Sequence, residues 1–234
     1  MNTVIDRCRS CVVRDHAICA DLADPELQAL SAIGRRRTIA AGQVLGWAGD
    51  ANLACATLVS GILKVTSSTA DGREQIVGLL FAGDFVGQLF LQEATLTVTA
   101  LTESDLCLYP RERFEHVLRS SHALDHALLR RTMASLNDAR ERMLTLGKRA
   151  ARERIAGFLL DLARRAAEDG RGSSAVLQVP ISRGDMADYL GLTIETVSRQ
   201  LTRFKAMGAI DLAKGGRSID VTDMAVLRSI ADAG

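Results

Sequence analysis

The sequence contains no apolar run near the ~18 to 20 residues that a transmembrane helix needs. Residues 1–6 are not followed by the apolar core of a signal peptide, so we expect a cytoplasmic protein, neither membrane-embedded nor secreted. Catalytic patterns are missing too. There is no glycine-rich phosphate loop, and no Cys or Ser pairs recognisably with the histidines, which are His16, His116, His122 and His126. These absences predict that the chain is not an enzyme.

The composition is that of an ordinary folded protein. Of the 234 residues, 47% are hydrophobic and 24% are charged, which argues against a disordered chain or a coiled coil. The formal net charge of +1 is divided unevenly along the chain. Residues 1–110 carry 8 Lys and Arg against 12 Asp and Glu, whereas residues 111–234 carry 21 against 16. The basic surplus of the second half favours a polyanionic partner there.

Cysteines are few but grouped. Without a secretion signal we expect reduced thiols rather than disulfides. Cys8, Cys11 and Cys19 can bind a metal or cluster within one short loop, with a fourth ligand from elsewhere. Zinc, an iron–sulfur cluster and unrelated free thiols remain open at this point. The negative charge of a thiolate-bound centre can be offset by nearby basic residues, unless these only form a solvated face: Arg7, Arg9, Arg14 and His16.

Short β-rich runs follow the cysteine-rich segment, which we assign to residues 1–23. Turn glycines separate these runs at spacings of 7, 12, 11 and 11 residues: Gly42, Gly49, Gly61, Gly72 and Gly83. Such regular spacing predicts an antiparallel barrel or jelly roll, and Asp71–Gly72 is typical of a hairpin turn. We therefore expect a β-roll sensor domain over residues 24–120.

A long helix is predicted next, over residues 121–147. Its apolar positions alternate at spacings of four and three residues, as in the seam of a coiled coil, and the members of this seam are Leu129, Met133, Leu136, Arg140 and Met143. The pattern predicts a dimerisation helix; the alternative is a helix that packs on its own β-domain. Arg140 is a polar interruption that weakens the seam unless it is neutralised.

Residues 148–234 contain the pattern of a helix-turn-helix. Ser182 and Asp185 form a capping box, Gly191 makes a turn, and Thr193 caps a second helix. In that helix one face is apolar, with Val197, Leu201 and Phe204. The opposite face carries Glu195, Ser198, Arg199 and Thr202.

The polar face offers the groups that read base edges, because Arg donates two bonds to guanine and Glu accepts from the cytosine amine. A β-hairpin follows, formed by residues 210–212 and 218–221, and its basic tip can lie on phosphates. The predicted DNA-binding residues are Ser182, Arg183, Thr193, Glu195, Ser198, Arg199, Thr202, Lys214 and Arg217.

The order of β-roll, long helix and winged helix-turn-helix resembles the CRP/FNR family of bacterial transcription regulators. Residues 181–199, ISRGDMADYLGLTIETVSR, are similar to the FNR branch nearly residue for residue, and residues 83–87, GDFVG, resemble its β-roll. The similarity runs from about Cys8 to Leu227. It implies an α+β fold with an N-terminal antiparallel β-roll, a dimerisation helix and a C-terminal winged helix-turn-helix.

The resemblance also implies a cofactor, a [4Fe-4S] cluster of the oxygen-sensing type. The positions that match its ligands are Cys8, Cys11, Cys19 and Cys107. Seven residues separate Cys11 from Cys19 where the best-known members have five, a spacing similar to a Cys-x2-Cys-x7-Cys subgroup. Cys55 matches no ligand and is expected to be a buried strand residue.

The resemblance implies a homodimer that binds inverted TTGAT-like half-sites under low oxygen, acts with RNA polymerase as an activator, and loses DNA affinity when oxygen destroys the cluster. Glu195 and Arg199 would read the G·C pair. Cyclic nucleotide is not expected, because residues 88–97 contain no arginine for its phosphate. The alternatives are a family member that responds to haem-bound nitric oxide or thiol redox, and a zinc-stabilised DNA-binding module.

Overall fold

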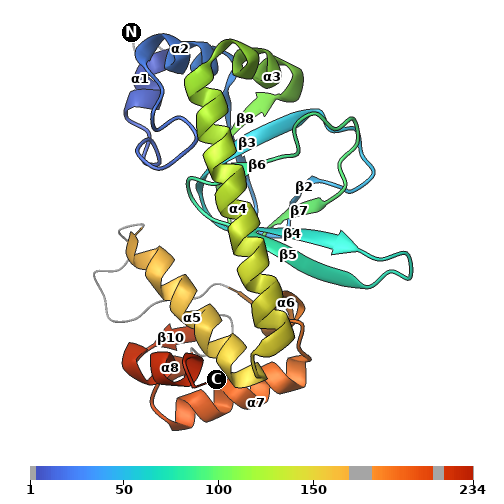
Figure 1. The fold of residues 1–234 in the computed structure, drawn as a ribbon, viewed down its shortest axis with the longest axis vertical. Coiled ribbons are helices and arrows are strands. Elements are labelled where there is room, and N and C mark those ends of the chain that lie inside the picture. Colours follow the sequence, from blue (N-terminus) through green and yellow to red (C-terminus); the bar gives the residue numbers. More distant parts are fainter. Residues whose placement is uncertain (1–3, 169–180, 213–218, 234) are drawn as a thin grey trace. The chain divides into compact units, whose positions relative to one another are not determined.

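The computed structural model describes residues 4–168, 181–212 and 219–233 (Figure 1). The chain forms two compact units, residues 1–137 and 138–234. The boundary between them falls inside the long helix α4 (His122–Lys148) rather than at one of its ends.

The first unit contains two four-stranded antiparallel sheets, which confirms the predicted β-roll. One sheet has the order β1 (Arg35–Ile39), β8 (Ser104–Pro110), β3 (Ala54–Ser60) and β6 (Phe85–Val86). The other has the order β2 (Val44–Gly46), β7 (Thr97–Ala100), β4 (Leu63–Ser68) and β5 (Glu74–Leu80). The five glycines that predicted the turns all adopt positive φ angles, including Gly72 between β4 and β5.

Side chains of β3 alternate between two buried environments. Ala56 and Leu58 point into the core between the sheets, with Leu106 of β8. Cys55 packs instead in a second core with the helices α2 (Asp24–Ile33), α3 (Arg111–Ser120) and α4. Because successive strand residues face opposite sides, Thr57 lies on the same side as Cys55. The strand is thus buried on both faces, and its outer face contacts Val13 and Ala17 of the N-terminal segment, which follow α1 (Val4–Arg9).

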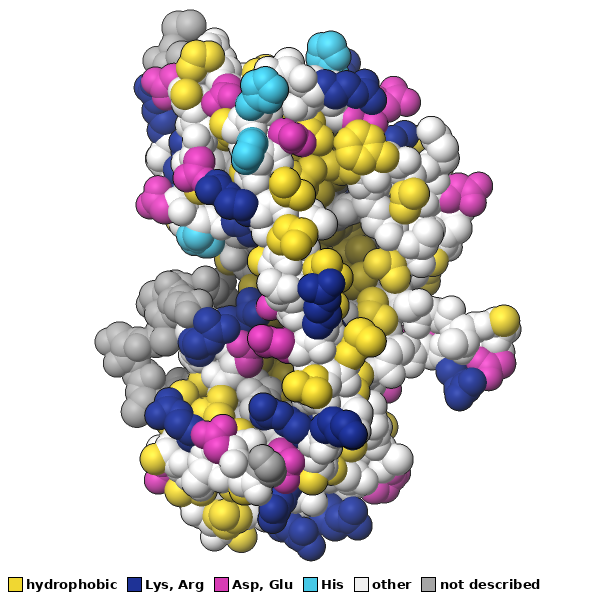
Figure 2. Space-filling view, in the orientation of Figure 1, with side chains coloured by type: hydrophobic (Ala, Val, Ile, Leu, Met, Phe, Trp, Pro, Cys, Tyr) yellow, Lys and Arg dark blue, Asp and Glu magenta, His cyan; other side chains and the backbone are white. Residues whose placement is uncertain are grey.

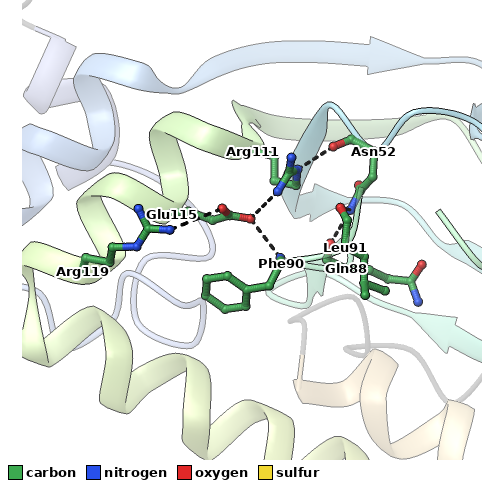
Figure 3. A network of polar contacts seen from close by, with 7 residues as sticks. All are labelled: Asn52, Gln88, Phe90, Leu91, Arg111, Glu115 and Arg119. Carbon is green, nitrogen blue, oxygen red and sulfur yellow. Dashed lines mark hydrogen bonds and ion pairs between the residues drawn. The ribbon is translucent and has the colours of Figure 1, made fainter. Parts of the chain in front are cut away.

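A buried polar network supports the loop between β6 and β7 (Figure 3). Arg111 and Glu115 form an ion pair of 2.7 Å with both side chains 8% exposed. The Phe90 N–H donates to Glu115 Oε1 at 2.9 Å, and Arg111 Nε donates to the Asn52 carbonyl at 2.6 Å. Phe90 itself has a φ of 64°, unusual outside glycine. The network therefore engages Nε and Nη1 of the Arg111 guanidinium within the protein.

Helix α4 confirms the predicted long helix. Leu124 and Ala127, near its beginning, are buried in the core of the first unit. Beyond them the helix has no buried side chain in the remaining 21 residues of its 27. At ~1.5 Å per residue the helix is about 40 Å long. Only its first turns place side chains in the core of its own β-domain.

The second unit contains the predicted helix-turn-helix. Its elements are α5 (Ala151–Glu168), α6 (Arg183–Leu190), α7 (Ile194–Ala206), β9 (Ile210–Leu212), β10 (Ile219–Val221) and α8 (Met224–Ala231). Val197, Leu201 and Phe204 are buried as expected. Strands β9 and β10 pair antiparallel, while Lys214 and Arg217 of the predicted wing lie outside the described residues. No helix in the described ranges is long and apolar enough to cross a membrane.

Candidate thiolate site, helix face and DNA interface

Four of the five cysteines meet at one pocket of the first unit. Its lining consists of Arg7, Cys8, Cys11, Val13, Cys19, Arg36, Thr57, Val59, Cys107 and Tyr109. All four of these cysteines are partly exposed. Cys55 is 2% exposed, does not belong to the lining, and packs in the helix-facing core as predicted for a buried strand residue.

The loop that carries Cys11 and Cys19 is built from tight turns. The Ala17 N–H donates to the Val13 carbonyl at 2.8 Å, and both side chains are buried against Val59 of β3. This apolar turn occupies the seven-residue spacing between the two cysteines. The loop is closed by the Arg14 guanidinium, which donates to the backbone carbonyls of Cys19, Ala20 and Leu22. The longer spacing is therefore accommodated by a packed turn.

A row of three side chains crosses the sheet beneath this loop. Cys107 of β8 pairs in register with Arg36 of β1 on one side and with Thr57 of β3 on the other. Directly opposed residues of antiparallel strands project from the same face, which is why all three line the pocket. From this row Arg36 Nη2 donates to Cys11 Sγ at 3.0 Å.

The basic residues around the pocket match those suggested by sequence proximity only in part, in Arg7 and Arg14. Arg7 lines the pocket, but Arg9 forms an ion pair with Asp24 at 2.5 Å. The His16 ring packs against Gly83 so closely that a Cβ on residue 83 would lie 2.5 Å from the ring. Arg36, distant in sequence, supplies the guanidinium that contacts a thiol. Strand register rather than chain proximity brings it there.

Burial favours the protonated form of two of the pocket thiols. It raises the pKa of Cys19 to about 11, opposed by the Arg14 charge, and it also raises the pKa of Cys8. Binding of a metal centre must therefore displace protons from these thiols. Within the described ranges, no group of three or more Cys, His, Asp and Glu side chains is close enough to hold one metal ion. The four thiols share a pocket without forming a ready-made single-ion site.

The chemistry of the lining fits an anionic, thiolate-ligated centre. Four soft sulfur ligands are the donor set of both iron–sulfur clusters and structural zinc. The guanidinium groups of Arg7 and Arg36 offset negative charge at the pocket. In addition, the buried Thr57 hydroxyl lies near the Tyr109 phenol but forms no hydrogen bond of normal geometry in the described part of the chain, so it is free to turn toward an acceptor bound in the pocket.

Two arginines of α4 hold the cysteine-bearing loop. Arg130 forms an ion pair with Asp21. Arg131 donates to the His16 carbonyl, and its Nη1 lies 3.8 Å from Oδ1 of Asp84, the residue just before β6. These contacts connect the loop to the helix next to Leu129, the first residue of the predicted seam. The loop is therefore joined to α4 at the point where the exposed part of the helix begins.

The predicted seam is an apolar stripe along α4. Leu129 is 56% exposed, Met133 49%, Leu136 43% and Met143 73%. Figure 2 shows apolar side chains interspersed with basic ones on the visible face of the molecule. Leu144, 63% exposed, adds to the stripe and was not predicted because it falls outside the four–three spacing. An uncovered stripe of this length on one helix is typical of a helix–helix interface.

Helix α7 presents the polar face that the sequence predicts. Glu195, Arg199 and Thr202 are exposed, and Ser198 is half-buried. The pKa of Glu195 is lowered by its own backbone N–H and by the Thr193 hydroxyl, so the carboxylate is ionised near neutral pH. Arg183 Nη1 donates to Ser198 Oγ at 3.4 Å and so joins this group from α6.

Ser182 and Thr193 cap the N-termini of α6 and α7. Ser182 Oγ accepts from the Asp185 N–H, and Thr193 Oγ1 accepts from the Thr196 N–H. Gly191 ends α6 in the left-handed conformation with a φ of 61°. These caps fix the turn between the two helices, and with it the direction in which the start of α7 points.

Each of the two units matches a known domain family. Residues 153–230 match the model of the Crp-like helix-turn-helix domain, and residues 36–121 match that of the cyclic nucleotide-binding domain. The chain is 42% identical to the transcriptional activator protein FnrL of Cereibacter sphaeroides, over 96% of this chain and 92% of that protein. It is 33% identical to the fumarate and nitrate reduction regulatory protein of Salmonella typhi, over 96% and 90% respectively.

Among solved structures, FixK2 from Bradyrhizobium japonicum is similar with a TM-score of 0.76 and 27% identity. The superposition covers 86% of this chain and 99% of that one. The same order of β-roll, long helix and helix-turn-helix is thus found in a solved relative.

Proposed function

Since the chain belongs to the CRP/FNR family of transcription regulators, we propose that it is an oxygen-responsive activator that binds DNA as a cluster-loaded homodimer. The cofactor would be a [4Fe-4S] cluster held by Cys8, Cys11, Cys19 and Cys107. The observation that carries this proposal is the meeting of these four thiols, from helix α1, the loop after it and a distant strand, at one pocket.

Each part of the pocket has a role in the proposed sensor. A bound cluster would supply an oxygen-labile link between the loop and β8. Cys107 anchors that link to the sheet, while Arg36 and Arg7 offset its charge. Arg130 and Arg131 connect the loop to α4, so the position of the loop biases the apolar stripe and with it dimerisation.

A dimer is needed for the proposed DNA site. Two recognition helices about one turn of DNA apart, ~34 Å, match an inverted repeat. We propose TTGAT-like half-sites, in which Glu195 and Arg199 read the G·C pair. RNA polymerase is the expected further partner of an activator. We also propose a cytoplasmic location, because the DNA of a bacterial cell lies there.

A cyclic nucleotide is not part of the proposal, although a cyclic nucleotide-binding domain model matches the β-roll. Residues 88–97 contain no arginine. The neighbouring Arg111 is committed to Glu115 and the Asn52 carbonyl. A buried phosphate would lack a counter-charge in this loop, and that is costly.

Zinc is the second candidate for the pocket, because four thiolates suit it as well. Anaerobic purification followed by iron, sulfide and zinc analysis distinguishes the two. We expect a brown protein with iron and sulfide that binds an inverted TTGAT-like repeat, and loss of colour and DNA affinity in air. A colourless, zinc-containing protein whose DNA binding ignores air would contradict the proposal.

Arg199→Ala is expected to weaken binding to this repeat and to flatten the preference at its guanine. The physical reason is that a good bidentate contact contributes about 1–3 kcal/mol of base discrimination. Binding-site selection with the anaerobic protein measures this preference. Lys214→Ala and Arg217→Ala, in the predicted wing, are controls that should weaken all sequences alike. If the Arg199→Ala protein still prefers guanine at that position, the assignment of α7 as the helix that reads this base is wrong.

A further inference from the structure

Thr57 lies in the middle of β3, where it lines the thiol pocket and is 2% exposed. Burial and Cys107 raise the pKa of the neighbouring Tyr109 phenol, and a polar contact from the Thr57 hydroxyl opposes this rise. Even so, no atom in the described part of the chain forms a hydrogen bond of normal geometry with Thr57 Oγ1. A buried hydroxyl without a partner is unfavourable, and native proteins rarely retain one.

The surroundings show what kind of partner is missing. On the pocket side, Thr57 is flanked by the thiol of Cys107, its register partner on β8. Val13 and Val59 supply no polar atom to the lining. On the other side of Cys107, Arg36 already directs its guanidinium to a sulfur, Cys11 Sγ, at 3.0 Å. Donors therefore stand on both sides of the sulfur ligands, and one of them lacks an acceptor.

We infer that the Thr57 hydroxyl donates a hydrogen bond to a sulfur atom of the cluster proposed above, and that this bond raises the reduction potential of the cluster. The inference rests on the proposed function and goes beyond its ligand set. Hydrogen bonds to sulfur withdraw electron density from a cluster and stabilise its more negative, reduced state. Thr57 is thus a positioning and tuning residue that slows oxidation of the cluster by oxygen.

The test compares Thr57→Val with Thr57→Ser in the full-length protein, purified anaerobically. Valine keeps the branched shape and removes the hydroxyl, whereas serine keeps the hydroxyl. The matched control is Thr66→Val, since Thr66 is another buried strand threonine whose hydroxyl instead donates to the Thr97 carbonyl at 3.3 Å. The readouts are iron and sulfide content, the midpoint potential, and the rate at which oxygen bleaches the visible absorption.

We expect Thr57→Val to load iron and sulfide fully, to show a more negative potential, and to bleach about three- to tenfold faster, the range of one net hydrogen bond. Thr57→Ser should restore both values, and Thr66→Val should match the wild type. In the cluster-free protein, Thr57→Val should melt at the wild-type temperature or above it, because an unsatisfied hydroxyl has been removed.

The possible failures are distinguishable. A wild-type protein that holds no iron would overturn the proposed function and this inference together. A loaded Thr57→Val protein with wild-type potential and bleaching rate would overturn the inference alone. If Thr57→Val does not load, loading by Thr57→Ser supports the hydroxyl as the essential group, and failure of both variants rejects it in favour of side-chain shape.

Discussion

Replacement of Cys107 by serine is expected to abolish cluster loading and, with it, oxygen-dependent DNA binding. Cys107 is the only one of the four proposed ligands that comes from a strand of the β-roll, so without it a cluster would have no ligand on the sheet. Serine preserves the shape but is a poor ligand for iron in a thiolate site. Iron content should fall to near background, and anaerobic DNA affinity should fall to that of the air-treated wild type.

Cys55→Ala is the matched control for this experiment. Cys55 is also a β-strand cysteine, but it is buried, and burial raises the pKa of its thiol to about 12. It packs among apolar side chains outside the pocket lining. We expect full iron content and a modest loss of stability, about 1 kcal/mol, for a small cavity. Serine variants of Cys8, Cys11 and Cys19 are compared with Cys55→Ala in the same way. Full loading of Cys107→Ser would remove Cys107 from the ligand set.

Leu136→Glu is expected to give a monomer that still loads a cluster. Leu136 lies at the centre of the apolar stripe of α4, far along the helix from the turns that pack on the β-roll. In a symmetric pair, two copies of the new carboxylate would be buried without partners. The loss of two leucine contacts plus this desolvation should weaken dimerisation by at least about a thousandfold. Sedimentation under anaerobic conditions measures it.

Ala134→Glu is the control, because Ala134 is exposed on the same part of α4 but lies well away from the stripe at 100° per residue. That variant should remain dimeric. Both proteins should contain wild-type amounts of iron, which separates loss of dimerisation from loss of folding. A dimeric Leu136→Glu protein would show that the stripe is covered by something other than a second copy of this chain.

Local patterns in the sequence predict the elements of this protein well. The caps Ser182 and Thr193, the turn at Gly191 and the buried face of α7 were all predicted correctly, because each depends on residues within one or two helical turns. The turn glycines likewise predict the strand connections of the β-roll. The long helix follows from its periodicity, although its packing at Leu124 and Ala127 does not.

The pocket shows the limit of such reasoning. The resemblance to a family implied the four cysteines, but nearness in sequence suggested Arg9 and His16 as charge partners, and the structure places them elsewhere. Arg36 and Thr57 were missed because neither belongs to a motif. They reach Cys107 only through the register of β1 and β3 against β8.

By itself, then, the sequence determined the family, the order of the elements and the two helices of the DNA-binding unit, since periodicity and capping act over a few residues. Only the tertiary structure decided which side chains surround the thiols, how the cysteine-bearing loop contacts α4, and which part of α4 stays uncovered. The physical reason is that strand pairing and side-chain packing join residues that are far apart in the chain, and no local pattern records that register.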